Sequence, residues 1–208
     1  ALRDGLGRRP TIAEFYRYGA SISQVRQGFG GWFELVEKMG DLTEEEKGLL
    51  NTNSDFFHEL EVTAMNKSYK MVLLEAFLEL DGWAKPIDIE TLSSKSFQVL
   101  HRRKTLFRDL PENLRSINDA TSKLWQSYWK NNPINAWIGG NISNESKRYF
   151  RIEGDIFFYD GGVLSGCEQT FSTMVRELVD YRLAGYEARQ PATPGAEIIK
   201  LGVVRKNV

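Results

Sequence analysis

Residues 69–78 read Tyr-Lys-Met-Val-Leu-Leu-Glu-Ala-Phe-Leu, and this stretch decides the fold. Its apolar side chains lie mostly at helical spacing and nearly surround the axis, a pattern typical of a buried helix. Asn66 or Ser68 begins the helix, and Asp81 with Gly82 ends it. We therefore expect a buried helix here, within a mainly helical protein.

The chain after this helix predicts further helices and one hairpin. Pro86 opens a helical unit, and another helix covers about 118–129. Residues 134–138 predict a short strand, a hairpin turns near Gly154, and a last helix covers about 168–187. This order is that of a winged-helix domain in which the hairpin is the wing. The predicted fold class is mainly α with a small antiparallel β-hairpin.

The chain before the buried helix divides into two parts. The first predicts three short helices joined by tight turns, with Thr11 as N-cap of the first and Ser21 at the start of the second, which is the helix-turn-helix plan. The second is acidic, with a capping box at Thr43 and a polar break over 51–54. The expected units are a helix-turn-helix-like unit (1–42), an acidic helical connector (43–66), a winged-helix-like body (67–190), and a linker leading into a further segment (191–208).

Composition limits the class of protein. The 208 residues allow one large or two small domains, and 41% hydrophobic residues suffice for a core. Because the sequence has no apolar run of about 18 residues, no membrane span or membrane partner is expected. A single cysteine, Cys167, excludes an intrachain disulfide and fits a reducing compartment, so we expect a cytoplasmic location. Both ends look cut from a larger protein.

The sequence offers no convincing catalytic or cofactor site. The two histidines, His58 and His101, lack metal-ligand spacing, and there is no phosphate-binding loop. Glu153 and Asp155 flank Gly154 and are better interpreted as a hairpin turn than as nuclease ligands. We therefore expect no metal, no cofactor and no catalytic residue in this chain.

The formal net charge of −1 conceals two basic regions. Residues 1–27 hold five arginines against two acids, and residues 101–151 hold ten basic residues against four acids, whereas acids concentrate over 34–61. Lysine and arginine that meet phosphates release counterions and give salt-dependent affinity. The alternative is that these charges simply form solvated faces.

Residues 6–40 resemble the short helix-turn-helix repeat associated with HNH and homing endonucleases. The resemblance rests on four segments: Gly7-Arg8-Arg9-Pro10-Thr11, Ser21 to Val25, Phe29-Gly30-Gly31-Trp32, and Met39-Gly40. It implies a DNA-contacting unit with residues 21–27 in the position of the recognition helix. Glutamine and arginine there could read base edges, and serine could bond a phosphate.

The first eighty residues also resemble the region downstream of the motor in bacterial superfamily 2 helicases of restriction and phage-defence type. The segments concerned are 6–15 and 67–74. Because the chain holds no helicase motif, the resemblance implies a non-catalytic DNA-binding or specificity module whose helicase motor lies elsewhere in the same protein. The residues expected to contact DNA are Arg8, Arg9, Ser23, Gln24, Arg26, Gln27, Arg102, Arg103, Lys104, Lys147 and Arg148.

A second hypothesis is a protein-interaction module that docks a helicase motor or a partner nuclease. It rests on a surplus of aromatic residues, namely Trp125, Tyr128, Trp129 and Trp137. The simpler interpretation of these four side chains is that most of them belong to the core.

Overall fold

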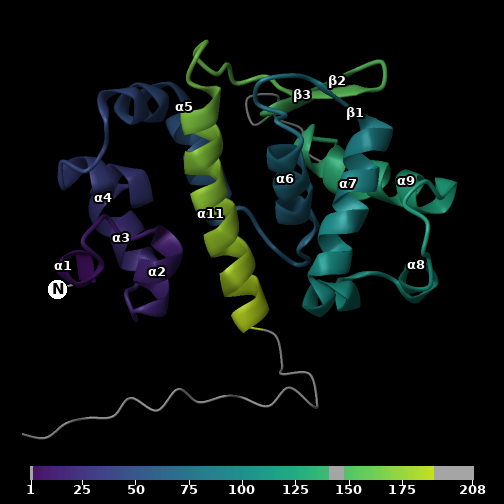
Figure 1. The fold of residues 1–208 in the computed structure, drawn as a ribbon, viewed down its shortest axis with the longest axis horizontal. Helices are drawn as coiled ribbons and strands as arrows, with labels where there is room; N and C mark the ends of the chain where they lie inside the picture. Colours follow the sequence, from purple (N-terminus) through teal and green to yellow (C-terminus); the bar gives the residue numbers. More distant parts are fainter. Residues whose placement is uncertain (1, 141–147, 190–208) are drawn as a thin grey trace, which may run out of the picture.

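One long helix, α11 (Glu168–Ala188), separates two groups of helices in the computed structural model, which describes residues 2–140 and 148–189. The first group is α1 (Leu2–Leu6), α2 (Ile12–Arg17), α3 (Ile22–Phe29), α4 (Trp32–Lys38) and α5 (Glu44–Val62). The second is α6 (Tyr69–Glu79), α7 (Ile89–Arg102), the 3-10 turn η1 (Lys104–Asp109), α8 (Glu112–Arg115), α9 (Lys123–Trp129), the π-helical turn η2 (Lys130–Ile134) and α10 (Asn135–Trp137). Helix α11 packs against α2, α5 and α6, and so joins the groups (Figure 1).

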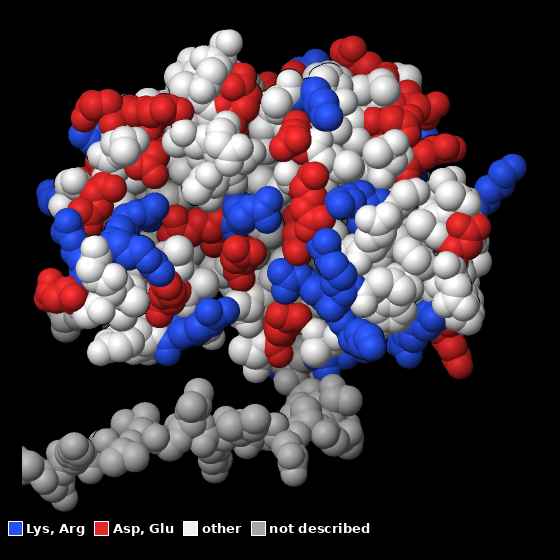
Figure 2. Space-filling view, viewed as in Figure 1, with Lys and Arg blue, Asp and Glu red and all other residues white. Residues whose placement is uncertain are grey.

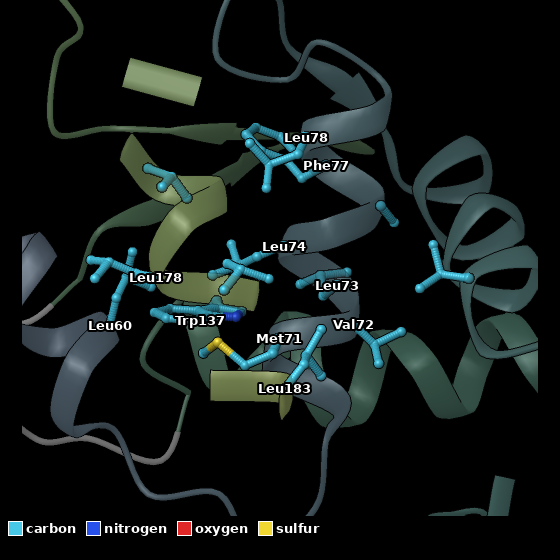
Figure 3. Packing of buried hydrophobic residues seen from close by; sticks show 14 of the residues in the cluster. Leu60, Met71, Val72, Leu73, Leu74, Phe77, Leu78, Trp137, Leu178 and Leu183 are labelled. Carbon is cyan, nitrogen blue, oxygen red and sulfur yellow. The ribbon is translucent and has the colours of Figure 1, made fainter. Parts of the chain in front are cut away.

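Helix α6 is the central helix of the core, as the sequence predicts. All residues from Met71 to Leu78 are buried, including Glu75. Figure 3 shows Leu73 and Leu74 of α6 in the same packed cluster as Leu178 and other side chains of α11. Because side chains all round α6 are buried, neighbouring elements must surround it, and helices α7 and α11 are two of them.

An aromatic cluster around Phe56 joins elements that are distant in the sequence. The Phe56 ring lies 5.8 Å from Trp83, 6.3 Å from Trp137, 5.9 Å from Phe150 and 6.2 Å from Phe171, measured between ring centroids. These partners come from the segment after α6, from α10, from the hairpin and from α11. Tilted, edge-to-face and stacked pairs of this kind add stability beyond the burial of their area.

The strands form one small antiparallel sheet of order β1-β3-β2. They are β1 (Ile87–Asp88), β2 (Phe150–Glu153) and β3 (Ile156–Tyr159). The hairpin between β2 and β3 turns at Gly154, which has a φ of 60°, so the predicted turn is confirmed. Strand β1, which the sequence did not predict, lies between α6 and α7, where the sequence predicted the start of a helical unit. The fold class, mainly α with a small antiparallel β element, is confirmed.

The strand predicted over 134–138 is wrong. These residues continue a helical path through the end of η2 and through α10, and Pro133 lies inside the wide turn of η2. A π-helical turn accommodates a proline ring and its missing amide donor, so the chain does not break there. The Trp137 indole donates a hydrogen bond to the Lys70 carbonyl 3.1 Å away, which fixes α10 on α6.

Two boundaries also differ from those predicted. The polar segment 51–54 does not end a helix, because α5 continues through it with a kink at Asn53 (φ −125°, ψ 22°). The buried Asn53 side chain donates to the Leu49 carbonyl and accepts from the Tyr159 hydroxyl, which compensates for the distortion. The helix predicted from about residue 118 begins instead at Lys123.

A single buried cluster extends from Ile12 to Tyr186. The helix-turn-helix-like unit, the connector and the winged-helix-like body expected from the sequence therefore share one core, while the segment expected over 191–208 lies outside the described residues. Within the described part of the chain, every helix is too short or too polar to span a membrane.

We predict opposite effects from alanine at two glycines. At Gly82 a Cβ atom would lie 2.4 Å from the ring of buried Phe77, so Gly82→Ala should lower the free energy of unfolding by about 1–3 kcal/mol. At Gly48, inside α5, a Cβ would meet no atom within 4 Å, and Gly48→Ala should raise it by about 0.5–1 kcal/mol. Urea unfolding of both variants tests the packing, and a stabilised Gly82→Ala would contradict it.

Candidate nucleic-acid interface

The three predicted helices of the first forty residues are present, and the first two carry side-chain N-caps. Thr11 and Glu14 form a reciprocal capping box at α2, with the Glu14 carboxylate 2.8 Å from the Thr11 amide. The Ser21 hydroxyl accepts from the Gln24 amide at the start of α3. Gly30 ends α3 with a φ of 100°, a conformation that favours glycine. These local signals position α3 between two tight turns.

Helix α3 buries one side and presents the other to solvent. Ile22 and Val25 point into the core, whereas Ser23, Gln24 and Gln27 are exposed and lie together at helical spacing. The side-chain amides of Gln24 and Gln27 have no hydrogen-bond partner within residues 2–140 and 148–189. We call Ser23, Gln24 and Gln27 the α3 face.

The predicted contact residues Arg8 and Arg9 are both held by carboxylates. Arg8 makes two hydrogen bonds with Glu14, of 2.9 and 2.6 Å, and these together with the Thr11 amide lower the pKa of Glu14 to about 2. The Arg9 guanidinium donates to both oxygens of Glu177 at 3.2 and 3.1 Å. Arg8 remains exposed, but Arg9 is half-buried and serves the fold.

Glu177 of α11 ties the N-terminal unit to the rest of the protein. Its Oε1 atom accepts hydrogen bonds from the Ile12 amide at 2.9 Å and from the Trp32 indole at 2.6 Å, in addition to Arg9. The carboxylate is buried, and burial raises its pKa while Arg9 and the other donors oppose that rise. One carboxylate thus joins the first turn of α2, the start of α4 and the segment before α2.

A second buried carboxylate, Glu61 near the end of α5, also holds the N-terminal unit, by a contact with the start of α4. Its Oε1 atom accepts from the Trp32 amide at 2.6 Å, at the N-terminus of α4. Its Oε2 atom is buried without a hydrogen-bond partner and lies 4.0 Å from Nη1 of Arg26. Burial raises the pKa of Glu61 to about 7, because the Trp32 amide and the arginines only partly offset the loss of solvation.

The second predicted basic region is largely neutralised. Arg102 pairs with Glu79, with one contact of 3.1 Å, and Arg103 donates from Nε to Glu75 at 2.8 Å. Arg103 also lies 3.7 Å from Glu187, so it joins α7 to α6 and α11. Lys104 is exposed at the start of η1. Of this predicted trio, only Lys104 lies in the structure without a carboxylate partner among the described residues.

The two basic regions do not merge into one basic track. Between α2, α11 and the end of α7 lies a cavity of about 270 Å³. Two basic residues, Arg17 and Arg103, line this cavity together with four acidic ones, namely Glu14, Glu177, Asp180 and Glu187. Figure 2 shows lysine and arginine interspersed with acids over the lower part of this face, while the upper edge is mainly acidic. A long polyanion would meet mixed charges here.

The remaining predicted residues lie elsewhere. Lys147 is outside the described residues. Arg148 is exposed and its side chain passes over Gly139, where a Cβ atom would lie 2.8 Å from its Cγ. The aromatic residues considered as a docking surface are core residues: Trp125, Trp129 and Trp137 are buried, and Tyr128 is half-buried against the cluster.

Sequence reasoning missed one surface that the body presents. On α9 the buried Trp125 and Trp129 leave Lys123, Leu124 and Ser127 exposed on the opposite side. The signal was available, because two tryptophans four residues apart define the buried side of a helix. The predicted helix began five residues too early, which obscured this division.

No family model matches the chain, and no significant match exists among curated proteins or solved structures. The resemblances to the endonuclease-associated repeat and to superfamily 2 helicases therefore stay predictions.

We predict that Glu61 makes the stability depend on pH. Folding raises the pKa of Glu61 from 4.5 to about 7, so the folded protein holds the proton more tightly than the unfolded chain. This contribution to stability is fully present below pH 4.5 and is lost as pH rises towards and past 7. Between pH 5 and 8 the wild type should therefore lose about 2–3 kcal/mol relative to Glu61→Gln, whose amide oxygen can still accept from Trp32. Urea unfolding at both pH values measures this difference, and parallel pH profiles would contradict the raised pKa.

Proposed function

We propose that this chain is a nucleic-acid-binding module of a larger DNA-processing protein and that it contacts DNA through the α3 face. The observation that carries the proposal is the exposed row of Ser23, Gln24 and Gln27 on the middle helix of a three-helix unit that is rigidly held by Glu61 and Glu177. Side-chain amides without internal partners are free to pair with another molecule.

The chemistry of the α3 face suits groove contacts more than phosphate neutralisation. A glutamine amide can donate and accept at once, which lets it bond adenine N6 and N7 in the major groove, while a serine hydroxyl can bond a phosphate oxygen. Because Arg9, Arg102 and Arg103 are committed to internal carboxylates, fewer of the predicted basic contact residues are available for phosphates. We therefore expect modest affinity and a shallow salt dependence.

The finer parts of the proposal rest on the resemblances found in the sequence. They are a parent protein of the superfamily 2 helicase type with a restriction or phage-defence role, a motor domain in the same chain as partner, a cytoplasmic location, and no catalysis by this module itself. The alternative, a docking module for a motor or a nuclease, loses the aromatic residues on which it was based, because they belong to the core.

We predict that two negative charges on the α3 face abolish most DNA binding. Gln24→Glu combined with Gln27→Glu should weaken binding of a duplex with 5′-hydroxyl ends by about tenfold or more. A carboxylate cannot donate a hydrogen bond to a base, and it is repelled by the phosphates that flank the groove. Fluorescence anisotropy at about 50 and 200 mM salt measures the affinity and its salt slope.

The matched control places the same two changes elsewhere. Gln98 on α7 and Gln169 on α11 are both exposed, so Gln98→Glu combined with Gln169→Glu gives the same net charge away from the α3 face. The control should bind like the wild type. Equal weakening in both double variants would show a nonspecific charge effect, and no DNA binding by the wild type at low salt would overturn the proposal.

A further inference from the structure

A polar cavity of about 280 Å³ lies beside the N-terminal unit, between α2, α3, α5 and α11. Its polar lining comprises Tyr16, Arg26, Glu61, Tyr181, Arg182 and Arg189. Three guanidinium groups thus converge on one opening with a single carboxyl group among them. The neighbouring cavity between α2, α11 and the end of α7 has the opposite balance, with two arginines and four acids in its lining.

The arginines of the cavity are held in different ways. Arg182 is half-buried and donates to the carbonyl oxygens of Leu60, Glu61 and Thr63, so it closes the C-terminal end of α5 and forms a fixed positive wall. Arg26 reaches the cavity from α3 and is 4.0 Å from Glu61, longer than a hydrogen bond. Arg189 lies exposed at the end of α11. Arg26 also interacts with the Tyr181 hydroxyl across the cavity, which occupies only part of its guanidinium group. The remaining N–H groups of Arg26 and those of Arg189 can bind a ligand.

Glu61 supplies a buried polar atom that no described residue satisfies. The residue is 4% exposed and lines the cavity, and its buried Oε2 atom has no hydrogen-bond partner among the described residues. The charged groups that act on it are Arg26 of α3 and Arg182 of α11, which favour its ionised form, and Glu34 of α4, which disfavours it. The Tyr181 hydroxyl of α11 also faces Glu61, and the two acidic groups disfavour each other's ionisation. A buried polar atom without a partner marks a place where a ligand could complete the hydrogen bonding.

We infer that this cavity binds the terminal phosphate of a phosphate monoester, with Arg26 and Arg189 as donors beside Arg182, whose guanidinium is held by backbone carbonyls. A monoester carries close to two negative charges at neutral pH, which matches several guanidinium groups better than a diester does. The cavity is larger than one phosphate group, and the half-exposed Tyr16 ring stands edge-on to Tyr181 at a centroid distance of 5.6 Å, which offers an aromatic surface to an attached nucleoside.

Glu61 completes the site when it is protonated. With a pKa near 7 its neutral form is abundant at and below neutral pH, and a protonated Oε2 donates a hydrogen bond to an anion. The ionised form instead repels the anion. This inference is independent of DNA binding by the α3 face, because a small anion can occupy the cavity whether or not a duplex contacts Ser23, Gln24 and Gln27.

We predict that removing the guanidinium groups of Arg26 and Arg189 removes the site. Isothermal titration of the full chain with inorganic phosphate and with sulfate, at constant ionic strength, should show one site, and Arg26→Gln combined with Arg189→Gln should weaken it at least about tenfold. The matched control, Lys85→Gln combined with Lys123→Gln, removes two exposed charges outside the cavity and should bind like the wild type. Equal affinities in the two double variants would overturn the assignment.

Two further variants keep the test decisive. Arg189→Gln alone changes an exposed residue at the end of α11 and should lower affinity without affecting the fold. Glu61→Gln places an amide donor at Oε2. Because sulfate keeps its charge from pH 6 to 8, its affinity for the wild type should fall about tenfold over that range as Glu61 ionises, and should stay constant for Glu61→Gln. Identical pH profiles would overturn the role given to Glu61.

The source of the phosphate is distinguished by competition with sulfate. A single strand with a 5′-phosphate should compete better than the same strand with a 5′-hydroxyl if the ligand is a strand end. A nucleoside monophosphate should compete better than the phosphorylated strand if the ligand is a free nucleotide. If neither monoester competes better than its unphosphorylated counterpart, the cavity is not a monoester site. A 5′-hydroxyl duplex tests the α3 face separately, so the two proposals can fail independently.

Discussion

The buried carboxylate of Glu177 is the contact on which the arrangement of the surfaces depends. It accepts hydrogen bonds from the Ile12 amide, the Trp32 indole and Arg9, and thereby fixes three segments of the N-terminal unit on α11. Three helices of six to eight residues each would be marginal without such a support, since short isolated helices are unstable in water. The α3 face and the cavity between α3 and α11 both owe their positions to this contact.

Burying a carboxylate costs free energy, and two of the buried carboxylates, Glu61 and Glu177, hold the N-terminal unit. Glu177 offsets this cost with three donors from different segments, whereas Glu61 leaves one oxygen without a partner, and burial raises the pKa of both. A buried ionic contact contributes little net stability compared with apolar packing, but breaking it is costly. We infer that these carboxylates specify the orientation of the N-terminal unit, and that the unsatisfied oxygen of Glu61 serves ligand binding.

Local signals in the sequence predicted most of the fold, and contacts between distant residues account for what was missed. Features that depend on residues close in the sequence could be predicted from it. They are the buried helix α6, the caps at Thr11 and Ser21, and the turn at Gly154. The strand predicted over 134–138 failed because an anchoring bond from Trp137 to Lys70 decides that segment. The charge count likewise could not show that Arg9 pairs with Glu177, 168 residues away, so it overestimated the free cations.

Hydrogen–deuterium exchange of Glu177→Ala tests the central claim most directly, with Gln169→Ala on the exposed side of the same helix as its control. If Glu177 holds the N-terminal unit in place, the amides of α2, α3 and α4 should exchange at least about tenfold faster in Glu177→Ala, because their local opening no longer breaks this contact, while those of α6 keep their protection. Unchanged protection of α2 to α4 relative to the control would contradict the account.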